Sequence, residues 1–151
     1  MRQAIHQLKY RNLRALAAPL AQLLNEYLVT HPVPGEVLVP VPLHPKRLRE
    51  RGYNQSALLA TELSKLTNLP VVADCLIRQR HTFPQARTAT VEERRSNVSE
   101  AFICCNDGLR NRQVILIDDV ATSGATLNAC AQALKAAGAT SVWGLVMARE
   151  I

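Results

Sequence analysis

One segment constrains the fold of this chain more than any other, an apolar run that ends abruptly in two acids. Residues 114–117 read Val-Ile-Leu-Ile, and Asp118 and Asp119 follow them directly. A short apolar run bounded in this way is typical of a strand buried on both faces of a parallel sheet. The apolar spacing of residues 124–137 predicts a helix that stops at Gly138. The segment therefore predicts a central strand ending at Asp118, then a loop and a helix.

Strand and helix patterns also alternate along the rest of the chain. Strands are predicted at residues 36–41, within 71–78, near 101–104 and at 141–147, and a helix at about 54–67. Apolar residues three and four apart predict a helical region over 3–30, in which Pro19 predicts a kink or a division into two helices. At 151 residues the chain is expected to form one domain. We predict an α/β fold with an open, mostly parallel twisted sheet flanked by helices.

Charge and composition narrow the classes of partner. Lys and Arg total 18 against 12 Asp and Glu, a net charge of +6 that favours phosphorylated small molecules, nucleic acid or acidic membrane surfaces. Aromatic residues make up 4% of the chain, few for a protein that stacks single-stranded bases. No stretch approaches the about 20 apolar residues of a membrane span, and the start lacks the apolar segment of a secretory signal. We expect a cytoplasmic protein whose four cysteines are free thiols rather than zinc ligands.

The loop after the two acids has the features of a phosphate site. Backbone N–H groups at a helix start are unpaired and carry the positive end of the helix dipole. Gly124 permits close approach of a ligand, and Thr122, Ser123 and Thr126 add hydroxyl donors. Two carboxylates would repel a phosphate, so they are expected to bind neutral hydroxyl groups of the same ligand, such as a sugar diol. The pattern predicts a sugar-phosphate site, with a plain helix cap at Asp119 or Thr122 as the alternative.

Two segments resemble known proteins. Residues 114–126 are similar to the phosphoribosyl-pyrophosphate (PRPP) motif of type I phosphoribosyltransferases: apolar strand, two acids, two residues, then Thr-Ser-Gly-x-Thr. Residues 39–55, VPVPLHPKRLRERGYNQ, and the opening residues 5–10 resemble the ComF/GntX proteins. The same resemblance includes the series Arg80, Thr82, Gln85, Arg94, Asn97, Ala101 and Phe102. The chain is identified as a member of this family over nearly its whole length, as a phosphoribosyltransferase-like domain of residues 1–151.

The resemblance implies further structure and a role for each part of the motif. The fold would be that of the type I enzymes with a small hood, and the Cys-rich zinc-binding segment that usually precedes it is expected to be absent. Asp118 and Asp119 would be catalytic residues that hold the ribose hydroxyls. The 5′-phosphate would be bound by Thr122, Ser123, Gly124, Ala125 and Thr126. Mg²⁺ would bridge PRPP oxygens without a direct protein ligand.

Basic segments would face the pyrophosphate of such a ligand. Residues 42–52 are expected to form the pyrophosphate loop, and if the stretch is helical two of its arginines share a face. Its candidate residues are His44, Lys46, Arg47 and Arg51, of which Arg51 is the best. Arg80 and Arg94 would belong to a loop that covers the ligand and excludes water. The alternatives are a solvated basic helix and an ordinary surface loop.

These features lead to one favoured function and two alternatives. The favoured function is transfer of a phosphoribosyl group from PRPP to an unidentified acceptor, with release of pyrophosphate. The first alternative is a non-catalytic accessory of competence and DNA uptake that binds a nucleotide or single-stranded DNA. The second is a regulator that senses PRPP without transferring it. The oligomeric state is left open, with a homodimer among the alternatives.

Overall fold

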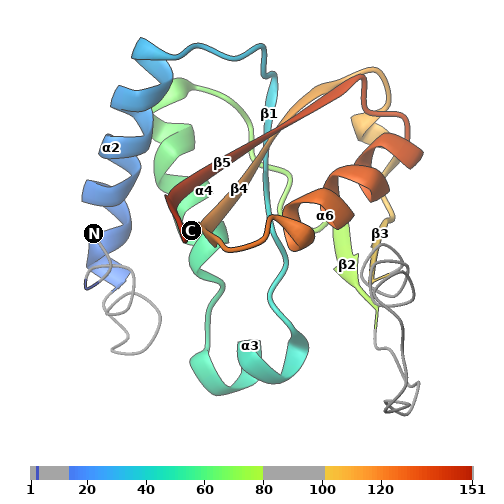
Figure 1. Ribbon diagram of the computed structural model, residues 1–151, viewed down its shortest axis with the longest axis horizontal. Helices are drawn as coiled ribbons and strands as arrows, with labels where there is room; N and C mark the ends of the chain where they lie inside the picture. Colours follow the sequence, from blue (N-terminus) through green and yellow to red (C-terminus); the bar gives the residue numbers. More distant parts are fainter. Residues whose placement is uncertain (1–2, 4–13, 80–100, 151) are drawn as a thin grey trace.

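A computed structural model describes residues 3, 14–79 and 101–150, and Figure 1 shows their arrangement. The elements in chain order are η1 (Arg14–Leu16), α2 (Ala17–Thr30), β1 (Val37–Pro40), α3 (Pro45–Arg51), α4 (Gln55–Thr67), β2 (Leu76–Arg78), β3 (Phe102–Cys104), η2 (Asp107–Leu109), β4 (Gln113–Ala121), α6 (Ala125–Ala136) and β5 (Ser141–Arg149). The strands and helices occur in the regions that the sequence predicts, and the short 3-10 helix η2 follows β3. Within the described parts of the chain, no helix has the length and apolar character needed to cross a membrane.

The main sheet is parallel and has the strand order β1-β4-β5, with β4 at its centre. Val39 pairs with Leu116, which pairs on its other side with Gly144. Strands β2 and β3 form a separate antiparallel pair beside α6. The predicted α/β class, with a parallel sheet flanked by helices, is confirmed.

Two apolar clusters hold the helices on the faces of this sheet. Because side chains alternate along a strand, Ile115 and Ile117 pack with α2 and α4, whereas Val114 and Leu116 pack with α6 and the β2–β3 pair. All four of these β4 side chains are buried. Burial of an aliphatic side chain of this size contributes about 1.5–3 kcal/mol, so the central strand is fixed strongly from both faces.

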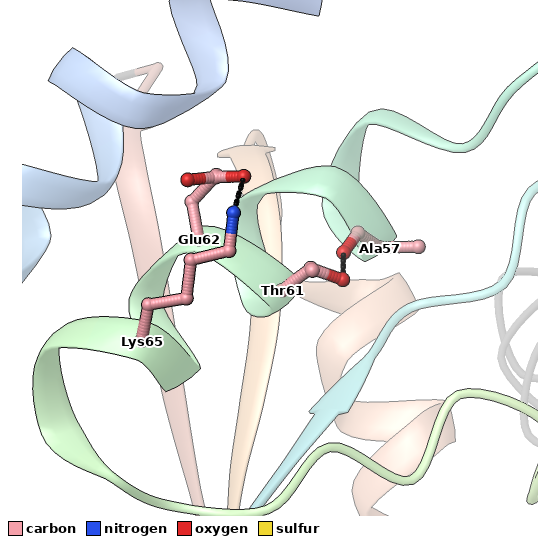
Figure 2. Close-up of polar contacts among 4 residues, drawn as sticks. All are labelled: Ala57, Thr61, Glu62 and Lys65. Atoms are coloured by element: carbon pink, nitrogen blue, oxygen red, sulfur yellow. Dashed lines mark hydrogen bonds and ion pairs between the residues drawn. The ribbon is translucent and has the colours of Figure 1, made fainter.

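Helix α4 makes hydrogen bonds within itself on its outer face and hydrogen bonds to distant residues at its beginning. On the outer face, the Thr61 hydroxyl donates to the Ala57 carbonyl at 2.9 Å, and Lys65 pairs with Glu62 at 2.6 Å (Figure 2). Exposed pairs of this kind contribute only a few tenths of a kcal/mol. At the start, the Asn54 side chain accepts from the Ser56 N–H and caps the helix. The apolar contacts of α4 with α2 and the sheet run along the helix, whereas its side-chain hydrogen bonds to other elements lie at its beginning.

One prediction at an element end was wrong, and another falls partly outside the described residues. Pro19 lies in the first turn of α2, where no backbone N–H donor is required, and α2 itself begins at Ala17 after η1. The predicted kink or division of the region 3–30 stays a prediction. The predicted helical residues 4–13 lie outside the described residues. Strand β4 does not end at Asp118 but continues to Ala121, because β5 goes on pairing with it up to Arg149.

Candidate functional site

The candidate site lies at the carboxyl ends of β1 and β4. Strand β1 pairs with β4 only as far as Ile117, so the acids that follow extend beyond its last residue, Pro40. The loop before α6 and the short helix α3 lie at this same end of the sheet (Figure 1). Ligands of open α/β sheets bind beyond the carboxyl ends of the strands. The two motifs found in the sequence are therefore brought to one end of the molecule.

Asp118 is partly buried and accepts two hydrogen bonds on one oxygen. Its Oδ1 accepts from the Ser56 hydroxyl at 3.0 Å and from the Asp119 N–H at 2.9 Å. Burial, followed by the neighbouring charge of Asp119, raises the pKa of Asp118 to about 6, against the lowering effect of these two donors. At neutral pH the side chain is a carboxylate in surroundings that favour its protonated form.

Asp119 occupies a different environment although it is the adjacent residue. Its side chain is buried, with 3% of the residue exposed, and its Oδ1 accepts from the Val120 N–H at 2.8 Å. The two acids therefore differ in burial, because Asp118 is partly exposed whereas Asp119 is buried. Asp118 is the more accessible acid for a ligand at this end of the sheet.

The loop between β4 and α6 is open to solvent. Thr122, Ser123, Ala125 and Thr126 are exposed, and Gly124 is partly exposed. Gly124 has φ +77°, and a Cβ placed there would have no atom within 4 Å.

The residue at the start of α6 is Gly124, which supplies no side-chain cap. The alternative reading of Asp119 or Thr122 as the helix cap is therefore wrong. One amide of the first turn, the N–H of Ala125, donates to Ser123 Oγ at 3.3 Å. The start of α6 thus combines an open backbone with exposed hydroxyl groups, which suits an anion.

The basic segment forms the seven-residue helix α3. His44 caps it, because His44 Nδ1 accepts from the Lys46 N–H at 3.2 Å. Lys46 and Arg47 are exposed, and Arg51 is partly buried with its guanidinium donating to Gln55 Oε1. The helix brings Arg47 and Arg51 to one face, as the four-residue spacing predicts. Arg51 is turned toward the start of α4, whereas the other cations face solvent.

Three consecutive residues at the start of α4 were not among the predicted site residues. Asn54 Nδ2 donates to the Val41 carbonyl at 2.9 Å, Gln55 receives the Arg51 guanidinium, and Ser56 holds Asp118. Asn54 is recognisable in the sequence as a helix cap after a glycine turn. The Ser56 contact joins residues 62 apart in the sequence and carries no local signal.

Two predicted site residues and the four cysteines have not yet been placed. Arg80 and Arg94 lie outside the described residues. The four cysteines form no disulfide, and burial raises the pKa of the Cys75 and Cys130 thiols to about 12, with Asp118 adding to the effect at Cys130. Within residues 14–79 and 101–150, no group of three or more His, Cys, Asp or Glu side chains is arranged to hold a metal ion.

Comparison with known proteins identifies relatives by sequence. The chain is 36% identical over 95% of its length to competence protein F of Haemophilus influenzae. It is 33% identical over 93% of its length to the DNA utilization protein YhgH of Escherichia coli K12, and 29% identical over 99% to competence protein ComFC of Bacillus subtilis. The chain is thus a homologue of these competence and DNA utilization proteins. No family model matches it. It covers 66%, 64% and 60% of these ComF relatives, less than two thirds of their length.

Solved structures show the same fold as this chain. A glutamine PRPP amidotransferase from Bacillus subtilis, complexed with ADP and GMP, matches 87% of the chain with a TM-score of 0.60 at 19% identity, over 26% of its own chain. A purine phosphoribosyltransferase from Pyrococcus horikoshii matches 87% with a TM-score of 0.54 at 16% identity, over 70% of its own chain. A protein from Neisseria gonorrhoeae with bound ppGpp matches 91% of the chain with a TM-score of 0.58 at 14% identity, over 69% of its own chain. The fold is that of type I phosphoribosyltransferases, as the sequence motif predicts.

Proposed function

We propose that the chain binds PRPP at the carboxyl ends of β1 and β4 and transfers its phosphoribosyl group to an acceptor. The observation that carries this proposal is the partly buried Asp118 carboxylate beside the open start of α6. A carboxylate accepts from sugar hydroxyl groups, while the helix start suits a phosphate. The ComF relationship and the shared fold support the proposal, because the solved neighbours include phosphoribosyltransferases.

Each end of the ligand is assigned to its own residues. The 5′-phosphate binds to the backbone N–H groups and hydroxyls of residues 122–126, where Gly124 leaves room for its oxygens. The ribose hydroxyls donate to Asp118, while the buried Asp119 adds negative charge beneath them. The pyrophosphate faces His44, Lys46, Arg47 and Arg51 of the α3 segment. Arg51 is partly buried, and its guanidinium is held by a hydrogen bond to Gln55, whereas Lys46 and Arg47 are exposed.

Magnesium is part of the substrate in this assignment. The described residues offer no cluster of side chains for a metal ion, and Mg²⁺ prefers to bridge phosphate oxygens while retaining its waters. The ion would enter as Mg²⁺–PRPP, held by the pyrophosphate oxygens. The protein residues bind and orient the rest of the substrate.

The transfer is a substitution at the anomeric carbon of the ribose. A nitrogen of the acceptor forms a bond to C1, the bond from C1 to the pyrophosphate oxygen breaks with its electron pair, and the acceptor releases a proton to water. The transition state carries positive charge on the sugar. Asp118 stabilises that charge, and the α3 cations stabilise the departing pyrophosphate.

Thermal unfolding with and without Mg²⁺–PRPP tests the binding step. A ligand at 100 times its dissociation constant stabilises a protein by about 2.7 kcal/mol, so the wild-type melting temperature should rise by several degrees. The double variant D118N/D119N should show no rise, and Lys65→Ala, on the outer face of α4, should behave as wild type. Equal stabilisation of the double variant and the wild type would contradict the site assignment.

Pyrophosphate release separates an enzyme from a PRPP-sensing regulator. The measurement uses a panel of purine and pyrimidine bases and amines as acceptors. Release with at least one acceptor, lost in D118N, supports transfer. Binding of PRPP without release by any acceptor supports the regulator.

DNA binding is a second candidate function, favoured by the names of the relatives and by the exposed cations of α3. Two relatives are named for competence and one for DNA utilization, and Lys46, Arg47 and Arg49 all face solvent. Such binding would weaken steeply with added salt, because each neutralised phosphate releases counterions. We expect single-stranded DNA affinity at low salt to fall in a K46A/R47A/R49A variant. An absence of DNA binding by the wild type at low salt would exclude this candidate.

A further inference from the structure

Ser56 is fixed on two sides at the beginning of α4. The residue is 1% exposed, and its backbone N–H donates to Asn54 Oδ1 at 3.0 Å. Asn54 in turn holds the carbonyl of Val41, immediately after β1. The position of Ser56 is therefore set by the end of β1, the strand that pairs with β4 as far as Ile117, the residue before Asp118.

The hydroxyl of Ser56 makes a bond unusual for its helix. Further along α4, the hydroxyls of Thr61 and Thr67 donate to carbonyls four residues earlier, at Ala57 and Leu63. Ser56 lies in the first turn and has no helical carbonyl at that distance, so its hydroxyl reaches out of the helix to Asp118 Oδ1. This is a contact between elements rather than local helix chemistry.

We propose that Ser56 is a positioning residue, whose hydroxyl holds the Asp118 side chain ionised and oriented toward the ribose of the ligand. The proposal rests on the function proposed above for Asp118. A hydroxyl has one proton to donate, and here it goes to the acid. Ser56 thus acts through Asp118 without touching the substrate.

Few groups around Asp118 favour its charged form, so the Ser56 hydroxyl has a large share in keeping it ionised. On β4, Asp119 opposes the charge of Asp118, and on α6 the buried Cys130 is a neutral thiol, its pKa raised to about 12. The neighbours from β5 and from the end of β1, Val146 and Val41, are uncharged. The charge is favoured by the Asp119 N–H and the Ser56 hydroxyl. Loss of that hydroxyl should raise the pKa of Asp118 into the neutral range.

The test is a carbon-13 NMR titration of the Asp118 carboxyl in the ligand-free protein. Ser56→Ala should raise the titration midpoint by about one pH unit, as expected for one lost hydrogen bond to a charged group. Ser56→Thr, which keeps a hydroxyl, should restore the midpoint. Ser64→Ala is the matched control on the same helix, because the Ser64 hydroxyl donates to the Leu69 carbonyl just after α4 at 2.6 Å and its loss should leave the midpoint unchanged.

A second titration, of Mg²⁺–PRPP affinity against pH, connects the residue to the ligand. In Ser56→Ala the affinity should fall about twofold at pH 7 and about fivefold at pH 6, and it should recover at higher pH, a pattern that simple loss of stability does not produce. An unchanged Asp118 midpoint in Ser56→Ala would overturn the inference, whether or not PRPP binds. Failure of the wild type to bind PRPP would overturn the proposed function and the ligand part of this assignment, while the shifted midpoint would remain measurable.

Discussion

Asp118 carries its charge in surroundings that oppose it, which links the stability of the protein to pH. Its pKa is raised from 3.8 to about 6, so between these values the folded protein binds more protons than the unfolded chain. The contribution of Asp118 to stability is therefore full below about pH 4 and is lost as the pH rises through about 6.

Replacement of Asp118 by Asn should therefore stabilise the fold while removing ligand binding. Asn keeps the shape and the acceptor for Ser56 but carries no charge. We expect D118N to gain about 1–3 kcal/mol in unfolding free energy at pH 7.5 and almost nothing at pH 4, measured by urea unfolding. A loss of stability at pH 7.5 would contradict this description of the charge.

Gly124 should be more important for binding than for folding. Its φ of +77° disfavours any side chain, so Gly124→Ala should lose about 1–2 kcal/mol in unfolding free energy. The added methyl group also occupies the open side of the loop where the phosphate is proposed to approach, so the thermal shift with Mg²⁺–PRPP should be lost.

Gly138→Ala provides the matched control for this glycine. Gly138 has φ +101° at the end of α6, where a Cβ would approach Arg110. The control should lose at least as much stability yet keep the thermal shift. Equal ligand-induced shifts in the two glycine variants would argue against the phosphate assignment.

At the scale of elements, local patterns predicted positions well and long-range contacts were missed. The starts of α4 and α6 lie within about a residue of the prediction, because caps, glycines and apolar spacing are local signals. The extension of β4 to Ala121 depends on pairing with β5, a partner about 30 residues away in the chain. The Ser56–Asp118 contact likewise depends on how α4 packs, so the sequence identified the acid but not the residue that holds it.

We expect the residues at the beginning of α4 to affect both the unfolding free energy and ligand binding at the site. Asn54→Ala removes the helix cap and the bond to the Val41 carbonyl, and should lower unfolding free energy by about 1–3 kcal/mol. It should also weaken Mg²⁺–PRPP binding through Ser56. Asn106→Ala, which removes the cap of η2, should cost less than about 1 kcal/mol and leave binding intact. Urea unfolding and calorimetric titration of both variants measure the two effects, and equal binding in both would argue against this role.

At the scale of the whole molecule, the candidate site is assembled on a sheet fixed from both faces. Strand β4 contributes side chains to both apolar clusters, and the acids follow this buried segment without a break. The strand thus delivers Asp118 to the end of the sheet, while α3, α4 and α6 bring cations, hydroxyls and backbone amides to the same end. The sequence motif predicted that the acids and the phosphate loop would lie at one end of the sheet, because parallel strands place their carboxyl ends together.

A crystal structure with Mg²⁺–PRPP would locate the ligand directly. We expect the 5′-phosphate within hydrogen-bond distance of the backbone N–H groups of residues 123–126. We also expect a ribose hydroxyl to donate to Asp118 while Ser56 keeps its bond to Oδ1. A ligand bound elsewhere on the molecule, with the loop at Gly124 empty, would contradict the proposed site.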